Sequence, residues 1–224
     1  MASNQAARRA AKANRRKAIV AQKRRAESQA GSLAARAAAA AAMPIRACLI
    51  NEGWQKTGMA SVYLVRGASA QHVTVGMFLL DASCLGIKDV GFDSFHGDEF
   101  DAFLTAVEVA MPFAEVDPCY ARKLIRDLAA WARSLGFAPH RDFAAVEKMF
   151  GDVRADDCAE VFQFGAQGTP VYIPGPTETP VQIRRRLERV AQIEGAEVAW
   201  PFDEDEGEVV DGEIVSEEVS AIAK

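Results

Sequence analysis

Ala60-Ser-Val-Tyr-Leu-Val-Arg66 and Gln71-His-Val-Thr-Val-Gly-Met-Phe-Leu-Leu80 are two neighbouring segments rich in β-branched and aromatic residues. Residues of these types favour β-strands, because their side chains pack well on a pleated surface. The segments are joined by Gly67-Ala-Ser-Ala70, a short link of small residues that suits a turn. This stretch therefore predicts a β-hairpin.

Further strands are predicted on both sides of this hairpin. Directly after Pro44, residues 45–50 alternate, with Ile45, Ala47 and Leu49 facing one way and Arg46, Cys48 and Ile50 the other. Near the other end, Ala159-Glu-Val-Phe-Gln-Phe164 and Pro170-Val-Tyr-Ile173 flank Gly165-Ala-Gln-Gly168. The first pattern predicts a strand, and the second predicts another hairpin.

Helical patterns begin after Asp81. Apolar residues recur at helical spacing over residues 99–111, and Asp117-Pro118 provides a cap and first turn for a helix that stops at Gly136. A shorter helix is predicted over residues 143–150, and Thr179-Pro-Val-Gln182 forms a capping box for a last helix reaching about Ile193. Together these patterns predict an α+β fold, with an antiparallel or mixed sheet of two hairpin-like strand groups and three to four helices.

The composition is that of an ordinary globular protein, with half of its 224 residues apolar and a quarter charged. The longest apolar run, Val73 to Leu80, is far short of the roughly 18 residues that span a bilayer, so we expect no membrane span. The four cysteines, at positions 48, 84, 119 and 158, form no CxxC pair, which fits a reducing, cytoplasmic location and argues against a zinc site. We expect neither a metal nor a cofactor.

The charge is divided between the ends of the chain. Residues 1–43 contain ten Lys and Arg but one acid, Glu27, whereas residues 44–224 carry a formal charge of −14, with nine acids between Asp203 and Glu218. We therefore divide the chain into a basic arm (1–43), a single α+β domain (44–200) and an acidic tail (201–224). A basic arm is suited to phosphate backbones, so RNA, the ribosome or DNA are the expected partners. The residues expected to bind them include Arg15, Arg16, Lys17, Arg24 and Arg25.

The arm has 18 alanines and few large apolar side chains. We expect it to be helical or disordered, to make few contacts with residues 45–200, and to be removable without loss of stability. An organellar transit peptide and a plain solubilising tail are alternative interpretations of the same composition.

The chain has no Gly-rich phosphate loop and no common hydrolase motif, but polar residues gather after the strand ending at Leu80. Cys84 there could act as a nucleophile if Lys88 or His140 lowered its pKa, with His140 as base and Asp142 orienting it. The simpler interpretation is that Cys84 is a small buried side chain, that Asp81 caps the turn, and that Lys88 pairs with Asp89 or Asp81.

Other candidate binding residues are Trp54, Asp81 and Lys88. Trp54 follows the first strand and could stack on a base or close a pocket, or could simply cover the core. The last helix carries a basic stripe, for which we expect pairing with the acidic tail in preference to nucleic acid. The stripe consists of Arg184, Arg185, Arg186 and Arg189.

Several blocks, covering roughly residues 45–175, resemble a family of uncharacterised bacterial proteins. The more specific ones are Cys84-Leu-Gly-Ile-Lys-Asp89 and Gly136-Phe-Ala-Pro-His-Arg-Asp-Phe143. The resemblance implies a bacterial source and a variable charged N-terminal extension, and it implies no activity.

Two functions of different classes follow. The first is a non-catalytic binding or adaptor protein whose arm contacts a polyanion. The second is a small hydrolase or transferase that uses Cys84, His140 and Asp142. We favour the first, because it depends on a long run of charge and the second on side chains whose proximity the sequence does not show.

Overall fold

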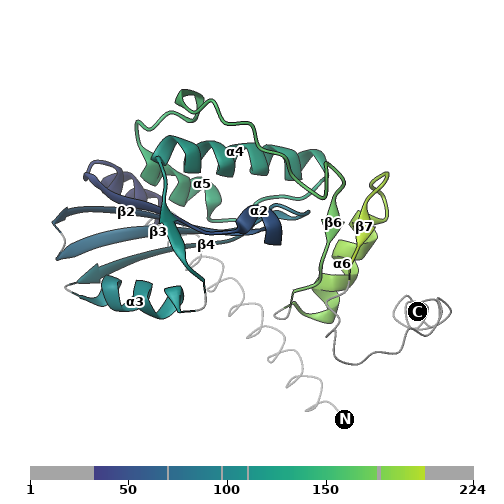
Figure 1. Cartoon of the computed structure of the whole chain (residues 1–224), viewed down its shortest axis with the longest axis horizontal. Coiled ribbons are helices and arrows are strands. Elements are labelled where there is room, and N and C mark those ends of the chain that lie inside the picture. Colours follow the sequence, from purple (N-terminus) through teal and green to yellow (C-terminus); the bar gives the residue numbers. More distant parts are fainter. Residues whose placement is uncertain (1–32, 70, 97, 110, 176–177, 200–224) are drawn as a thin grey trace, which may run out of the picture.

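The computed structural model describes residues 33–199 except 70, 97, 110, 176 and 177 (Figure 1). It confirms the predicted α+β class. Five strands form an antiparallel sheet in the order β4-β3-β2-β1-β5. The strands are β1 (Ile45–Asn51), β2 (Met59–Ser69), β3 (His72–Asp81), β4 (Gly86–His96) and β5 (Phe113–Glu115).

The predicted hairpin is β2 and β3, at the centre of the sheet. Its register places Val62 opposite Phe78 and Val65 opposite Val75. The register shifts between Arg66 and Ser69, which still belong to β2, so most of the link predicted over residues 67–70 is part of the strand. The strand predicted at residues 45–50 is β1, and its successive side chains face opposite sides of the sheet, as expected. Cys48 belongs to the core on one face of the sheet, and Leu49 packs on the other.

The prediction that helical structure begins after Asp81 is wrong, because β4 pairs with β3 along its whole length. This edge strand is rich in polar residues, which obscure the alternation of apolar and polar side chains that is typical of a strand. Two of these polar residues accept hydrogen bonds from backbone N–H groups. The carboxylates of Asp89 and Asp93 each accept a hydrogen bond, 2.8 Å long, from the N–H of the following residue. These N–H groups therefore bond to side chains rather than to another strand.

One face of the sheet is covered by α4 (Pro118–Ser134) and α5 (Phe143–Val146), which continues as a 3₁₀ turn, Glu147–Phe150 (Figure 1). The predicted cap is present: the Asp117 carboxylate accepts from the Cys119 N–H at 2.8 Å. Fully burying a large aliphatic side chain stabilises a fold by about 1.5–3 kcal/mol, so this apolar face of α4 holds the core together. Its buried residues include Leu124, Ile125 and Leu128.

The opposite face is covered by α3 (Glu99–Glu108). Phe100, Phe103 and Leu104, three of the apolar residues predicted for this helix, pack against a second cluster on the sheet that includes Tyr63. None of the residues of α3 is fully buried. This second face is therefore the more thinly covered one.

The end of the predicted arm is part of the domain. Residues 33–41 are helical, and Ala37 and Ala40 are buried in the main core. The expectation of few contacts is thus wrong for residues 33–43, because alanine's small side chain lets a helix approach a sheet closely without any large apolar residue. Residues 1–32, with all five basic residues singled out above, and the tail 201–224 lie outside the described residues.

Arg66 fixes this helical end in place. Its guanidinium is buried and donates hydrogen bonds to the carbonyls of Ala41 (3.0 Å), Met43 (2.6 Å) and Phe150 (2.9 Å). Carbonyls at a helix end lack partners within the helix, and the arginine supplies hydrogen bonds to carbonyls at the ends of two helical segments. One side chain on β2 thus joins the chain before β1 to the 3₁₀ turn.

The second predicted hairpin is wrong. Only its turn forms: Ala166 and Thr169 exchange backbone hydrogen bonds of 2.8 and 3.0 Å. Residues 159–164 are not a strand, because Phe162 and Phe164 pack on the core instead of pairing. Val171–Tyr172 (β6) pairs in parallel with Glu197–Val198 (β7), and this pair lies beside α6 (Pro180–Val190), whose predicted capping box is present.

Within residues 33–199, apart from the five gaps, no helix has the length and apolar character that a membrane crossing requires.

Candidate functional site

A short helix, α2 (Trp54–Thr57), lies against the turn between β3 and β4. Gly53 and Gly58 flank it, both at φ 71°, a left-handed conformation that glycine adopts without strain. Gly58 also approaches the turn so closely that a Cβ there would lie 2.0 Å from the Ser83 Oγ. The Gly58 carbonyl accepts from the Ala82 N–H at 2.7 Å, which fixes the helix to the turn.

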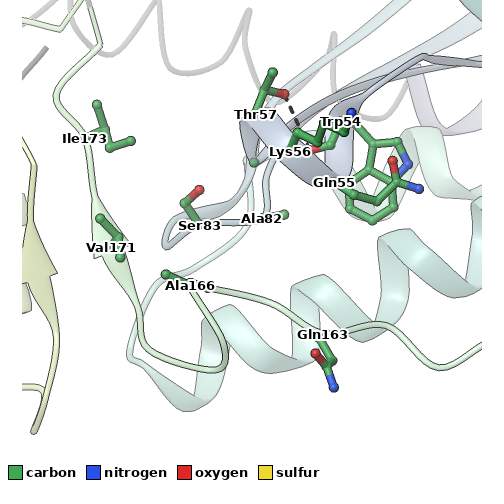
Figure 2. Close-up of a pocket in the computed structure, with 12 residues that line it drawn as sticks. Trp54, Gln55, Lys56, Thr57, Ala82, Ser83, Gln163, Ala166, Val171 and Ile173 are labelled. Carbon is green, nitrogen blue, oxygen red and sulfur yellow. Dashed lines mark hydrogen bonds between the residues drawn. The ribbon is translucent and has the colours of Figure 1, made fainter.

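A cavity of about 290 Å³ opens beside α2 (Figure 2). Its floor is the turn at Ala82 and Ser83, and one wall is α2. The side chains of Val171 and Ile173, on and just beyond β6, lie across the cavity from Thr57 and Ser83. Three segments that are distant in sequence therefore build one pocket.

Hydrogen bonds hold these three segments together. The Ala82 carbonyl accepts from the Gly165 N–H at 2.7 Å, and the Ser83 carbonyl accepts from the Val171 N–H at 2.9 Å. The turn at the pocket floor is therefore bonded to α2 on one side and to the chain around β6 on the other.

Asp81, a predicted binding residue, shapes the floor from below. Its buried carboxylate accepts from the N–H groups of Ser83 (3.0 Å) and Cys84 (2.9 Å). Burial raises the pKa of Asp81, while the bond from Cys84 and the charge of Lys88 act against this rise. Asp81 thus acts as the turn cap that was the simpler interpretation of this residue.

Trp54 combines its two predicted roles. Only 5% of it is exposed, it belongs to the main core, and its ring centroid lies 6.3 Å from that of Phe162. It also contributes to the lining of the pocket. We conclude that Trp54 covers the core and at the same time forms part of the pocket wall.

The lining combines hydrogen-bonding groups with a small apolar patch. Lys56 supplies an ammonium, Thr57 and Ser83 supply hydroxyls, and Gln55 and Gln163 supply amides. No carboxylate, imidazole or thiol is among the residues that line this pocket, all of which belong to the described part of the chain. Such a lining suits a neutral or anionic ligand held by hydrogen bonds.

Cys84 lies outside this pocket. It is completely buried, in a cluster with Leu85, Tyr172 and Val190. Burial, and then the charge of Asp81, raise the pKa of the Cys84 thiol to about 12, so it is protonated at neutral pH. A protonated thiol is a poor nucleophile.

His140 has different neighbours from Cys84. Its Nε2 lies 3.6 Å from an Asp89 carboxylate oxygen, and its Nδ1 lies 4.0 Å from one of Asp142. The Nδ1 also accepts a long hydrogen bond, 3.4 Å, from the Asp142 N–H. The structure thus brings together His140 and Asp142, and the geometry gives the cysteine-nucleophile hypothesis no support.

Lys88 belongs to a polar network that the sequence analysis missed. Its Nζ lies 3.3 Å from a carboxylate oxygen of Glu178, whose side chain is 5% exposed. Arg186 forms a second ion pair with this carboxylate, and the Tyr172 hydroxyl donates to it at 2.6 Å. The sequence does not show that Glu178 is buried, because an acidic residue directly before a capping Thr has the local pattern of a solvent-exposed residue.

The remaining predicted features are less informative. Of the basic stripe on α6, Arg186 pairs with Glu178. The pairing expected between the stripe and the acidic tail lies outside the described residues. In the described part of the chain, no group of three or more His, Cys, Asp or Glu side chains could hold a metal ion.

Comparison with family models, with curated proteins and with solved structures finds no match for this chain. The resemblance to bacterial proteins stays a prediction. Functional inference therefore depends on the charge pattern of the sequence and on the geometry described above.

Proposed function

We propose that this chain is a non-catalytic, cytoplasmic binding protein whose basic N-terminal segment binds the phosphate backbone of a nucleic acid, as free RNA, as ribosomal RNA or as DNA. The α+β domain is the module that this segment attaches to the polyanion. The observation that carries the proposal is the segregation of charge, with ten Lys and Arg against one acid in residues 1–43. Each phosphate that such residues neutralise releases counterions, which favours binding.

The anchoring of residues 33–43 supports this proposal. Nine of the ten basic residues come before residue 33, and the chain that follows is held by Arg66 and by two buried alanines. The tenth, Arg36, stacks over the Phe92 ring at 4.7 Å. The basic segment is therefore attached to the domain at a fixed point, as an adaptor requires.

The chemistry of the domain supports the non-catalytic part. The most nucleophilic residue type that the sequence placed near a strand end, Cys84, is buried and protonated. The pocket beside α2 offers hydrogen-bonding groups and one ammonium, which are functional groups suited to binding a ligand.

Fluorescence anisotropy with labelled single-stranded RNA and duplex DNA tests the proposal. The variant Arg15→Gln, Arg16→Gln, Lys17→Gln, Arg24→Gln, Arg25→Gln removes five positive charges. If these residues contact phosphates, the slope of log affinity against log salt falls by roughly 3.5 to 4.5, and affinity at low salt falls by orders of magnitude.

A control variant matches this change in number and residue type within the domain. It replaces five exposed side chains by Gln, namely Arg141, Lys148, Arg154, Arg184 and Arg185. We expect it to bind nearly as the unaltered chain does. Equal losses in both variants would mean that net charge, and not the N-terminal segment, governs binding, and salt-insensitive binding would overturn the proposal.

Deletion of residues 201–224 tests the competing role of the acidic tail. The tail is attracted to the same basic residues as a phosphate backbone is, so its removal should strengthen binding, most at low ionic strength where charges are least screened. Unchanged affinity would show that the tail does not compete.

A further inference from the structure

The lining of the pocket beside α2 carries positive charge and no negative charge. Lys56 is the single ionisable residue of this lining, all of which belongs to the described part of the chain. An anion enclosed there would find a partner of opposite sign, which a charged group needs once it leaves water. A cation would find none. The lining therefore favours an anionic ligand.

The Ser83 hydroxyl offers a second contact for an anion. Ser83 is only partly buried, and Figure 2 shows its side chain between α2 and the side chains of Val171 and Ile173. Its backbone is held in place, because its N–H donates to Asp81 at 3.0 Å and its carbonyl accepts from Val171 at 2.9 Å. A donor fixed in this way loses little freedom when a ligand binds.

The Thr57 hydroxyl is less available to a ligand. Its oxygen accepts a hydrogen bond from the Met59 N–H at 3.2 Å and lies 3.4 Å from the Trp54 carbonyl, so it serves the end of its own helix. Lys56 and Ser83 are therefore the groups that we expect to contact the charged part of a ligand.

The opposite side of the pocket is apolar. Val171 and Ile173 line it, and Ile173 is 40% exposed although large aliphatic side chains are mostly buried. A hydrocarbon group placed between these side chains would remove apolar surface from water on both partners. The pocket thus suits a ligand that is charged at one end and aliphatic at the other.

Size and charge narrow the class of ligand further. The volume of 290 Å³ is at the low end of the roughly 300–1,000 Å³ that small-molecule sites occupy. A phosphate monoester carries nearly two negative charges at neutral pH, and the lining has one ammonium to meet them. A free amino acid would bring an ammonium that finds no carboxylate in the lining. A small monoanion without an ammonium fits best.

We propose that this pocket binds a small aliphatic monocarboxylate, with its carboxylate at Lys56 and Ser83 and its hydrocarbon chain against Val171 and Ile173. The geometry that carries the proposal is the placement of one ammonium and one hydroxyl across a small cavity from an exposed apolar wall. The proposal concerns the domain and does not depend on the basic N-terminal segment.

NMR titration of the full chain with matched ligands tests the proposal. Isovalerate should shift the backbone amide signals of Gly58, Ser83 and Ile173. Isovaleramide has the same shape without the charge and should bind more weakly, as should valine and isobutyl phosphate. Acetate should also bind more weakly, because each methylene that is buried raises affinity by up to about fourfold.

Two variants separate the two ends of the ligand. Lys56→Gln should lower isovalerate affinity by roughly two- to fivefold, the worth of an exposed ion pair, and should remove the preference for isovalerate over isovaleramide. Ile173→Ser should keep that preference but reduce the preference for isovalerate over acetate. Lys148→Gln removes an exposed lysine that does not line the pocket and should bind as the unaltered chain does.

A third variant blocks the cavity without touching the core. Ala166 is exposed and lines the pocket, so Ala166→Phe should fill part of the volume and lower isovalerate affinity at least tenfold while the fold is kept. Equal binding of isovalerate and isovaleramide, tighter binding of valine or of isobutyl phosphate, or unchanged binding by Ala166→Phe would each overturn the proposal.

The chain in which Arg15, Arg16, Lys17, Arg24 and Arg25 are replaced by Gln distinguishes this proposal from the proposed function. It should bind isovalerate as the unaltered chain does. Loss of isovalerate binding in this variant would place the carboxylate on the N-terminal segment and overturn the pocket assignment. Loss of nucleic-acid binding alone leaves the pocket assignment intact.

Discussion

The Arg66 guanidinium donates to the carbonyl of Met43 at 2.6 Å and to that of Phe150 at 2.9 Å, across 84 residues of sequence in the second case. A side chain that would usually be exposed is therefore enclosed at the junction of two helical ends. Burial lowers the pKa of this arginine, and the charge of Asp152 acts against that change. The domain thus begins before β1, at the helical residues 33–41.

Removal of this junction should destabilise the fold. We expect Arg66→Met to cost about 2–4 kcal/mol, because the carbonyls of Ala41, Met43 and Phe150 lose the hydrogen bonds of the guanidinium. Deleting residues 1–42 should lower the unfolding midpoint in urea substantially, since Ala37 and Ala40 leave the core. Deleting residues 1–32 is the control, and their scarcity of large apolar side chains predicts a small effect. Equal stability of the two deletions would contradict the anchoring role.

Asp81 offers a test of what a buried carboxylate does in a turn. We expect Asp81→Ala to cost about 2–3 kcal/mol, because the N–H groups of Ser83 and Cys84 lose their acceptor. Asp81→Asn keeps an acceptor oxygen and should cost much less.

The pH dependence of Asp81 has a defined sign. Its folded pKa is raised above the unfolded value of 3.8, so its contribution to stability is greatest below that value and declines as the pH rises through the folded pKa. This decline should be missing from Asp81→Asn. Parallel curves for the two proteins in urea titrations at several pH values would refute it.

Glu178 should have the opposite pH dependence. Burial works to raise its pKa, but the bonds from Tyr172 and Arg186 prevail and lower it from 4.5. The stability that it contributes is therefore present above pH 4.5 and is lost as the pH falls through the folded pKa. Glu178→Gln should cost about 1–3 kcal/mol at neutral pH, because the Lys88 and Arg186 charges lose their shared partner, and should flatten the acid limb of the stability curve.

Gly58→Ala should disturb the pocket in two separable ways. The new Cβ would meet the Ser83 Oγ and would also adopt a left-handed φ, and together these effects should cost about 1–3 kcal/mol. Adding Ser83→Gly removes the clash but not the backbone strain. We therefore expect the double variant to recover part of the loss, and no recovery would show that the close approach is unimportant.

The parts of the fold that could be predicted from sequence are those with strong local signals. The β2–β3 hairpin and α4 have such signals in their β-branched run, in the Asp117 cap and in Gly136. By contrast, β4 was missed because its aspartates interrupt the alternation, and residues 159–164 were mistaken for a strand because their aromatic alternation serves packing instead.

The pocket could not be predicted, since its floor and walls come from residues 54–58, 82–83 and 163–173, which only tertiary structure brings together. Trp54 and Asp81 were selected for their local position in the sequence; Trp54 lines this pocket, and Asp81 accepts hydrogen bonds from the turn at its floor. The environment of Glu178 depends on contacts between distant segments. A linear pattern does not contain that information.

The carboxylates along β4 affect how this molecule behaves among its own copies. An exposed edge strand can promote aggregation, because its free N–H groups can form hydrogen bonds with the backbone of another molecule. Here Asp89 and Asp93 occupy two of those donors, and Glu99 occupies that of His96 at 2.7 Å. A second backbone would have to displace three side-chain acceptors, so we expect that copies of the chain do not join through this edge into fibrils, even in a concentrated solution.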